Sequence, residues 1–267
     1  MLSTDRPRSP VQTFRGSQQS FVISSPLTER LKTLAQQQDV TLFMTLLAVF
    51  KSLLSCQIKQ DNLAIGSPIA NRNRIELEEL IGFFVNTLVL RIDTAGNPTF
   101  RELLRRTREV ALAAYAHPDF PFEKLVEELQ PERNLSYNPL FQVWFVLQNA
   151  PMPPLELAGL TLSILEFDVG MSRHDLSLTL WEVSEGIQGL FGYKTDLFEA
   201  ATIAGMMRGF QTLLNQVVIQ PDINIDDLAE ILAEAERQHQ IEQEKQIHLS
   251  GIQKLKMAKR KVMKSLK

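Results

Sequence analysis

Two hydrophobic periodicities alternate along this chain, and their alternation is the feature that most restricts its fold. Short apolar runs such as NLAIGSPI at 62–69 are separated by segments whose leucines recur at helical spacing, such as Leu27, Leu31 and Leu34. Strands are expected at 21–24, 62–69, 83–92, 140–149, 160–166, 176–183 and 187–195, and helices from Ser25, from Thr41, from Thr99 to about Tyr115, at 122–129 and at 199–219. This mixture, partly hairpin-like in the second half, predicts an α/β fold with a mixed open sheet flanked by helices.

Local end signals support these boundaries. Ser25-Pro26 joins a candidate cap to a proline in the first helical turn, and Thr41 is a candidate cap for the second helix. Thr99 and Glu102 have the spacing of a capping box. Residues 1–20 are polar and rich in Pro, Arg, Ser and Gln, which predicts an extended lead-in rather than a regular element.

The charge of the chain is divided unevenly. The formal net charge is −3, but residues 251–267 contain seven cations and no acid, so an acidic body carries a basic tail. The single cysteine, Cys56, lies in an apolar helical pattern and supports neither a disulfide nor a cysteine-based zinc site. This cysteine usage fits a reducing cytoplasm, where we expect the protein to reside. There is no apolar run long enough for a transmembrane helix, and no membrane partner is expected.

The segment IGFFVNTLVLR at 81–91 places polar groups in an apolar strand. Gly82 precedes the strand and indicates unusual backbone angles or a close approach. Asn86 and Thr87 bring an amide and a hydroxyl inside it, and buried polar groups need partners. Bonding to neighbouring backbone is the simpler interpretation of both residues.

The segment HPDFPFEKLVEEL at 117–129 gathers a histidine, an aspartate and a glutamate. His117, Asp119 and Glu123 invite an acid–base or metal hypothesis, but no second histidine stands near them and no metal site is expected. Structural use is favoured: Asp119 caps the following helix, and Phe120 and Phe122 anchor it in the core. Pro121 then falls in the first helical turn.

The segment RNLSYNPLF at 133–141 ends on Asn138-Pro139. A residue before proline is driven into extended or turn geometry, which would fix the Asn138 amide at the end of the long apolar strand that follows. Open α/β sheets place their binding sites at strand ends. Asn138 is therefore a candidate site residue.

Taken together, these three segments resemble the last three core motifs of a nonribosomal peptide synthetase condensation domain. The family patterns are [I/V]GxFVNT[Q/L]xxR, [H/N]QD[Y/V]PFE and RDxSRNPL. The chain departs from them at Pro118, Phe120, Asn134 and Tyr137. Further likeness lies in RPRSPVQTFRG, IGSPIANRNR and YKTDLFEAATI, so that the resemblance covers about residues 1–235.

The resemblance implies one lobe of the two-lobed, chloramphenicol-acetyltransferase-like fold. Residues 1–225 would form the C-terminal lobe, and residues 226–267 a helical extension with a basic tail. By this resemblance Asn138, with Arg133 and Ser136, lines the channel where carrier-bound substrates meet, while Pro139 and the other motif residues are scaffold. The implied reaction is amide-bond formation, in secondary-metabolite synthesis, between a thioester donor and an aminoacyl acceptor. Both arrive on phosphopantetheine arms of peptidyl carrier proteins, and this chain itself is expected to bind no cofactor.

The catalytic HHxxxDG motif of that family does not occur in these 267 residues. The four histidines are His117, His174, His239 and His248, and Arg173-His174-Asp175 is the nearest echo, better explained as a surface or strand-end polar pair. We therefore expect a partial domain that is inactive alone and works with a separately encoded N-terminal lobe, or a gene remnant. A non-catalytic module that docks carrier proteins is the alternative, and the pattern leaves its status as an enzyme open.

The basic tail has two interpretations. Its cations include Lys254, Lys256, Lys259, Arg260 and Lys261, interleaved with apolar residues. A solvated helix is the simpler interpretation, and docking to an acidic helix of a downstream synthetase subunit is the sharper one. A basic amphipathic helix is also compatible with nucleic acid or a membrane surface, although the acidic total charge gives no argument for nucleic acid, which is not an expected partner.

Overall fold

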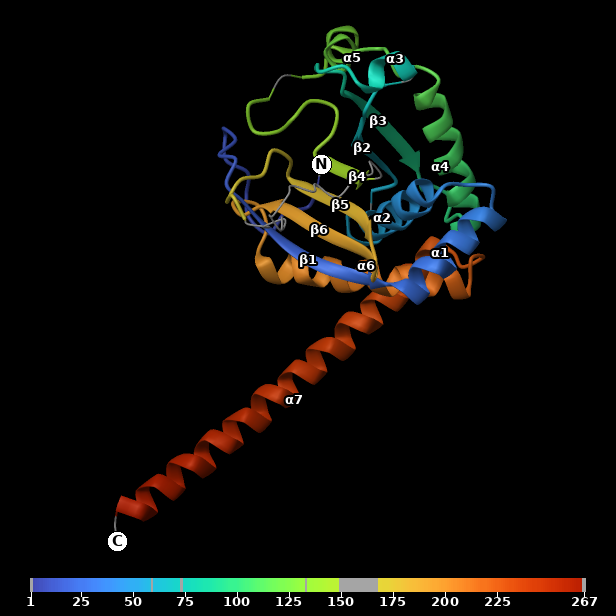
Figure 1. Cartoon of the computed structure of the whole chain (residues 1–267). Coiled ribbons are helices and arrows are strands. Elements are labelled where there is room, and N and C mark those ends of the chain that lie inside the picture. The colour runs from blue at the N-terminus through green and yellow to red at the C-terminus, as the bar shows by residue number, and fades with distance from the viewer. Residues whose placement is uncertain (1, 59, 73, 133, 149–167, 266–267) are drawn as a thin grey trace, which may run out of the picture.

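The computed structural model describes residues 2–58, 60–72, 74–132, 134–148 and 168–265, without the side chains of Ile58 and residues 247–265. Within these described residues, six strands form one sheet in the order β1-β6-β5-β4-β2-β3 (Figure 1). The strands are β1 (Gly16–Ser24), β2 (Asn62–Ile69), β3 (Asn86–Asp93), β4 (Val143–Gln148), β5 (Leu176–Val183) and β6 (Gly186–Lys194). The helices are α1 (Ser25–Gln37), α2 (Leu42–Ile58), α3 (Ile75–Glu78), α4 (Phe100–Tyr115), α5 (Phe122–Leu129), α6 (Ala200–Ile219) and α7 (Ile225–Ser265).

The sheet is mixed because its central strand, β4, is parallel to both of its neighbours. Val143 of β4 pairs with Ile65 of β2 and with Leu176 of β5, while the pairs β1–β6, β5–β6 and β2–β3 are antiparallel. Parallel neighbours bring the starts of β4 and β5 to one edge of the sheet. The expected α/β fold with a mixed sheet flanked by helices is confirmed.

Alternation of side chains gives the sheet one dry face. Along β5, Leu176, Leu178 and Leu180 are buried, whereas the intervening residues are only partly buried. On the dry face an aromatic cluster joins strands to helices. Phe50 of α2 stacks on Phe145 of β4 with ring centroids 5.8 Å apart, and Phe210 of α6 meets Phe21, Phe50 and Phe191 edge to face.

The end signals read from the sequence mostly hold. Met44 N–H donates to the Thr41 hydroxyl and Glu102 N–H to the Thr99 hydroxyl, which confirms both caps. The glutamate of the expected capping box instead pairs with Arg105 and Arg106. Strand 62–69 is confirmed at both ends. The helix expected at Ser25 also forms, but Ser24 stands at its cap without a side-chain hydrogen bond.

Other boundaries differ. Strand β1 begins at Gly16, inside the expected lead-in, because Gly16 to Ser24 pair along the whole of β6. Strand β3 begins at Asn86 and β4 at Val143, each three residues later than predicted. The strand expected at 160–166 lies outside the described residues. No single described helix is long and apolar enough to cross a membrane; α1 and α2 meet those criteria only as a pair bent by 103°.

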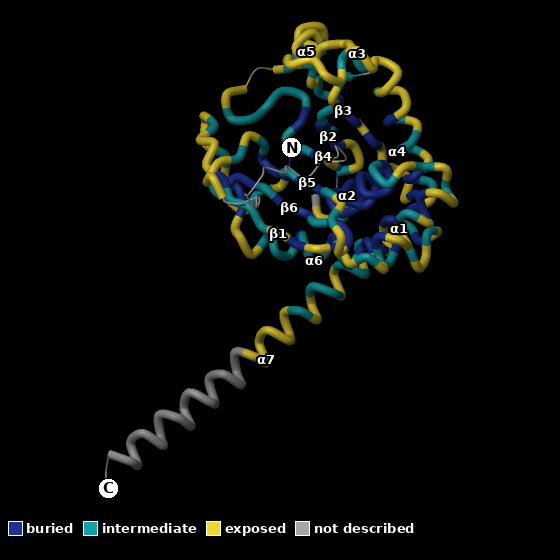
Figure 2. Tube along the Cα trace, viewed as in Figure 1, coloured by how far each residue is buried: buried dark blue, intermediate teal, exposed yellow. Residues whose placement is uncertain are grey.

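Helix α7 starts in the core and leaves it. Ile225 and Leu228 are buried, and Ile231 and Leu232 pack partly buried against the core cluster. Every residue from 240 to 246 is exposed, and the helix runs away from the body as a single rod (Figures 1 and 2). The predicted division of the chain at residue 226 stays a prediction.

The turn between β5 and β6 depends on Gly186. Its φ is 132°, a conformation that L side chains rarely adopt, and a Cβ there would overlap the Ile23 carbonyl oxygen. We expect Gly186→Ala to lower the free energy of unfolding by at least about 2 kcal/mol in denaturant titrations. Gly96→Ala is the matched control, because Gly96 also has positive φ but faces open space. Its expected cost is about 1 kcal/mol; equal losses would contradict a steric role for the turn.

Candidate functional site

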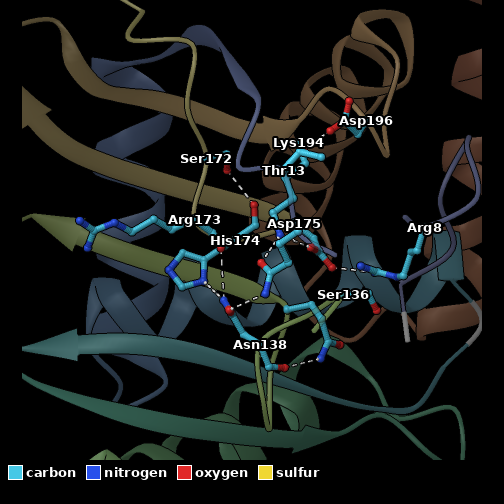
Figure 3. A network of polar contacts seen from close by, with 12 residues as sticks. Arg8, Thr13, Ser136, Asn138, Ser172, Arg173, His174, Asp175, Lys194 and Asp196 are labelled. Carbon is cyan, nitrogen blue, oxygen red and sulfur yellow. Dashed lines mark hydrogen bonds and ion pairs between the residues drawn. The ribbon is translucent and has the colours of Figure 1, made fainter. Parts of the chain in front are cut away.

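The candidate site lies where the segments before β4 and β5 meet. Asn138 precedes β4 and His174 precedes β5, and the parallel pairing of these strands brings the two residues together (Figure 3). Asn138 Nδ2 donates to the Arg173 carbonyl at 3.2 Å and lies 3.3 Å from His174 Nδ1. Gln12 Nε2 donates to Asn138 Oδ1 at 3.4 Å. The predicted site residue is thus held at a strand end, as expected, but at the amino ends of the strands.

His174 is a flat, neutral partner for this amide. Its ring stacks on Trp144 with centroids 4.7 Å apart and planes 3° from parallel, and Phe141 lies 5.8 Å away. Burial lowers the pKa of His174 to about 4, with Lys194 lowering it further and Asp175 opposing. At neutral pH the imidazole is therefore uncharged. The Asn138 amide nitrogen can only donate a hydrogen bond, so His174 Nδ1 accepts it. The proton of the neutral imidazole is therefore on Nε2.

Next to His174 lies a buried ion cluster. The Asp175 side chain is 2% exposed; Lys194 Nζ lies 3.0 Å from its Oδ1 and Arg8 Nη2 lies 2.6 Å from its Oδ2. Lys194 Nζ also donates to Gln12 Oε1 at 2.7 Å. Since Gln12 in turn donates to Asn138, a continuous polar chain links the N-terminal segment, the end of β6 and the candidate amide (Figure 3).

Of the two interpretations of His174-Asp175, the strand-end pair is confirmed, because β5 begins at Leu176. The surface pair is wrong, because Asp175 is buried and accompanied by two cations. Sequence reasoning missed Arg8, Gln12 and Lys194. A signal was present in Lys194, which ends a largely apolar strand and would need a carboxylate partner once buried.

The other predicted channel residues are less closely engaged. Ser136 donates its hydroxyl and its backbone N–H to Asn134 Oδ1, which closes a local turn, and it borders a small cavity shared with Arg8 and Gln12. Arg133 lies outside the described residues. Pro139 lines a different groove of about 710 Å³, between α5 and the 130–139 segment, together with Glu123 and Val126.

Asn86 ties the first two motifs together. Its Nδ2 donates to the carbonyls of Pro118 and Phe120, both at 2.8 Å, and its Oδ1 accepts from Thr87 N–H and Phe122 N–H. All four bonds go to backbone, which supports the simpler interpretation of this residue. Phe122 begins α5, so Asn86, rather than the expected Asp119, satisfies a free N–H of that helix.

Several scaffold expectations need correction. Phe120 is 49% exposed rather than anchored, while Phe122 packs on Phe141. Gly82 does not have positive φ, so the expected unusual backbone angle is wrong, but the expected close approach is present: a Cβ there would lie 2.8 Å from the flexible Phe84 ring. His117, Asp119, Pro121 and Glu123 are exposed, and Thr87 is partly buried within β3. Among the described residues, no group of three or more His, Cys, Asp or Glu side chains has the geometry to hold a metal.

Comparison with known proteins identifies the family to which the chain belongs. The Condensation domain family model matches residues 1–241. The chain is 48% identical over 239 residues to one of the linear gramicidin synthase proteins of Brevibacillus parabrevis, covering 89% of this chain and 3% of that protein. It is 44% identical over 236 residues to malpinin synthetase of Mortierella alpina, covering 88% and 3%. The chain therefore spans less than a tenth of either relative.

Solved structures agree with the fold. The X-domain from teicoplanin biosynthesis is 28% identical, with a TM-score of 0.78, and the match covers 85% of this chain and 52% of that one. A four-domain nonribosomal peptide synthetase bound to AMP and glycine is 27% identical, with a TM-score of 0.77 and coverage of 84% and 18%. Family model, relatives and fold agree with the motifs: the chain belongs to the condensation domain family of nonribosomal peptide synthetases.

Proposed function

We propose that this chain supplies the C-terminal lobe of a condensation domain and positions carrier-bound substrates for amide-bond formation. Membership of the family supports the reaction class. The observation that carries the proposal is Asn138, an amide held at the strand ends by contacts of 3.2 to 3.4 Å. Such long contacts leave the amide able to exchange a partner for a substrate carbonyl or amine.

The chemistry of the reaction defines what the lobe must do. The acceptor amine attacks the thioester carbonyl, a C–N bond forms, the C–S bond breaks, and the thiol of the phosphopantetheine arm leaves. Peptidyl carrier proteins bring both substrates on such arms, so this chain needs no cofactor of its own. Asn138 orients a reacting carbonyl or amine by hydrogen bonding. An amide side chain has no titratable group and does not remove the amine proton.

His174 is poorly suited to that proton transfer. Its Nδ1 faces Asn138 and its ring is stacked on Trp144, so the basic nitrogen is already engaged. A pKa of about 4 also makes it a weak base at neutral pH. We assign proton removal to the HHxxxDG histidine of a complementing N-terminal lobe, either in the same polypeptide or on a separate one.

Exposed apolar side chains support a complementing lobe. Around α3 and the start of β3, Ile75, Ile81 and Phe83 are 82%, 104% and 92% exposed. Large apolar groups gathered on one surface favour association, because contact removes them from water. A partner lobe is the occupant that the proposed function requires.

The first test reconstitutes the domain in two halves. The chain is mixed with a lobe carrying HHxxxDG and with loaded carrier proteins, and the condensed product is measured by mass spectrometry. We expect product with the wild-type chain and a loss of about 10²-fold in rate with Asn138→Ala, the typical cost of removing one oriented donor.

Asn215→Ala is the matched control, because Asn215 is an exposed amide on α6 that bonds only its own helix at Gln211. Thermal melting checks that Asn138→Ala remains folded. Two results contradict the proposal: no complex between the halves at micromolar concentration, or equal rates for the Asn138 and Asn215 variants. Carrier-protein binding without turnover would favour a docking module instead.

A second prediction concerns acid. The pKa of His174 is about 4 in the folded chain against about 6.5 unfolded, so the unfolded chain binds more protons between these values. Above about pH 6.5 this histidine does not reduce the free energy of unfolding. As the pH falls from about 6.5 through 4, the free energy of unfolding decreases by up to about 3 kcal/mol. His174→Gln keeps an acceptor for Asn138 but does not titrate.

Denaturant unfolding of both proteins from pH 7 to pH 4 measures this effect. Titration of the carboxylates lowers the free energy of unfolding equally in both proteins. The wild type should lose up to about 3 kcal/mol more than His174→Gln, because only the wild type has the titrating histidine. Parallel curves would show that His174 is not held neutral.

A further inference from the structure

Four polar side chains at the candidate site form a hydrogen-bonded chain with a single direction. Lys194 Nζ donates to Gln12 Oε1 at 2.7 Å, and an ammonium group has no acceptor. The Gln12 amide therefore keeps its oxygen towards Lys194 and donates from Nε2 to Asn138 Oδ1, 3.4 Å away. Asn138 in turn has Nδ2 towards His174 Nδ1, at 3.3 Å. Every link donates in the same direction, from Lys194 to His174 (Figure 3).

The Arg173 carbonyl gives an independent reason for the same direction. A carbonyl oxygen only accepts hydrogen bonds, and Asn138 Nδ2 lies 3.2 Å from it. If the Asn138 amide turned over, its oxygen would face this carbonyl and its NH2 group would face the NH2 group of Gln12. Both ends of the chain therefore specify one orientation of the Asn138 amide.

The ring of His174 is also fixed in position. It stacks on Trp144 with planes 3° from parallel, and Phe141, which is 4% exposed, lies 5.8 Å away. Phe141 itself lies over Gly66, where a Cβ would come within 2.3 Å of the ring. The Ser172 hydroxyl donates to the His174 carbonyl at 2.7 Å. Packing and hydrogen bonds thus fix both the plane of the imidazole and its backbone.

The far nitrogen of this ring, Nε2, is the last donor of the chain. Nδ1 faces Asn138, and Nε2 lies on the side of the ring that points away from that amide (Figure 3). Among the residues that the structure describes, none forms a hydrogen bond with Nε2. Burial lowers the pKa of His174 to about 4, so at neutral pH the ring is uncharged and Nε2 carries its one proton.

We propose that His174 Nε2–H donates a hydrogen bond to the carbonyl oxygen of the thioester substrate, and that Asn138 is the positioning residue that holds this donor. The inference rests on the proposed function. Negative charge develops on that oxygen as the C–N bond forms, and it is withdrawn as the C–S bond breaks and the thiol leaves. A fixed donor stabilises this charge. His174 keeps its own proton throughout, and the amine proton passes to the histidine of the N-terminal lobe.

The surroundings of His174 suit an oxygen that becomes negative during the reaction. Arg8 and Lys194 lie 2.6 and 3.0 Å from Asp175, so this ion cluster has one positive charge in excess. A permanently anionic ligand would favour a charged imidazolium, which burial opposes. A carbonyl is neutral before the reaction, so the interaction is strongest in the transition state. Neutral imidazoles with a lowered pKa polarise carbonyl groups in this way.

Nuclear magnetic resonance tests the direction of the chain without any turnover. The full-length protein is labelled with ¹⁵N-histidine, and the His174 signals are identified by their loss in His174→Gln. Couplings between the ring nitrogens and the carbon-bound protons report which nitrogen is protonated. At pH 7 we expect the proton on Nε2 and none on Nδ1.

Asn138→Asp should reverse this result. A carboxylate at residue 138 can only accept, so the ring has to donate from Nδ1 and that nitrogen should become protonated. Asn215→Asp is the matched control and should keep the wild-type pattern, because Asn215 is an exposed amide on α6. Thermal melting checks that both variants are folded. A protonated Nδ1 in the wild type, or an unprotonated Nδ1 in folded Asn138→Asp, would overturn the proposal.

The rate of the reconstituted reaction tests the carbonyl contact. His174→Phe keeps a flat ring against Trp144 but has no donor, so its kcat should fall about 10²-fold with KM unchanged. His174→Gln offers an oxygen to Asn138 and an NH2 group to the carbonyl, and it should recover most of the lost rate. A ring that serves only for packing predicts the opposite order of the two variants.

The possible failures of this experiment are distinct. Product from the wild-type chain, with an equal kcat for His174→Phe or a lower one for His174→Gln than for His174→Phe, would overturn the role of His174 and leave the proposed function intact. No product from the wild-type chain and its complementing lobe would overturn the proposed function, and the carbonyl contact with it.

Discussion

The arrangement of the candidate site depends on the neutralisation of Asp175. A carboxylate 2% exposed costs several kcal/mol in lost hydration unless cations accompany it, and Lys194 and Arg8 do so from the end of β6 and from the N-terminal segment. Lys194 N–H also donates to the Asp175 carbonyl, which holds the backbone of the two strands together. The same ammonium engages Gln12, and Gln12 reaches Asn138. The position of the Asn138 amide therefore depends on the ion pair between Lys194 and Asp175.

Two asparagines with similar local patterns end in different roles, and their hydrogen bonds distinguish them. Asn86 donates twice at 2.8 Å and accepts twice, so its amide is saturated by backbone and serves to join β3 to α5. The contacts of Asn138 are all 3.2 Å or longer, and one of its partners is a neutral imidazole. A saturated amide is expensive to redirect, whereas a loosely bonded one can change partners at little cost.

The sequence predicted those features whose interacting residues are close together in the chain, and missed those that depend on distant residues. Thr41 and Thr99 cap helices that begin within three residues of them, and the apolar run at 62–69 forms its strand in full. The start of β1 was missed because its polar residues are recruited by pairing with β6. The α5 cap was assigned to Asp119 because Asn86, more than 30 residues away, leaves no mark in the local pattern. Asn138 was indicated both by the Asn138-Pro139 pair before an apolar strand and by family resemblance; its partners Gln12 and His174 needed the fold.

The electrostatics around Asn138 also set a division of labour in the proposed reaction. Burial, and after it Lys194 and Arg173, lower the pKa of His174 and keep its ring uncharged, which preserves an acceptor for the amide and at the same time makes that ring a poor base. Of the other histidines with described side chains, His117 is exposed at the end of α4 and His239 bonds Gln243 on α7. A site tuned to orient a carbonyl through a neutral amide–imidazole pair would lose that pair if His174 took up a proton. Orientation and proton transfer are thus better served by different lobes, because the environment that suits one of these tasks opposes the other.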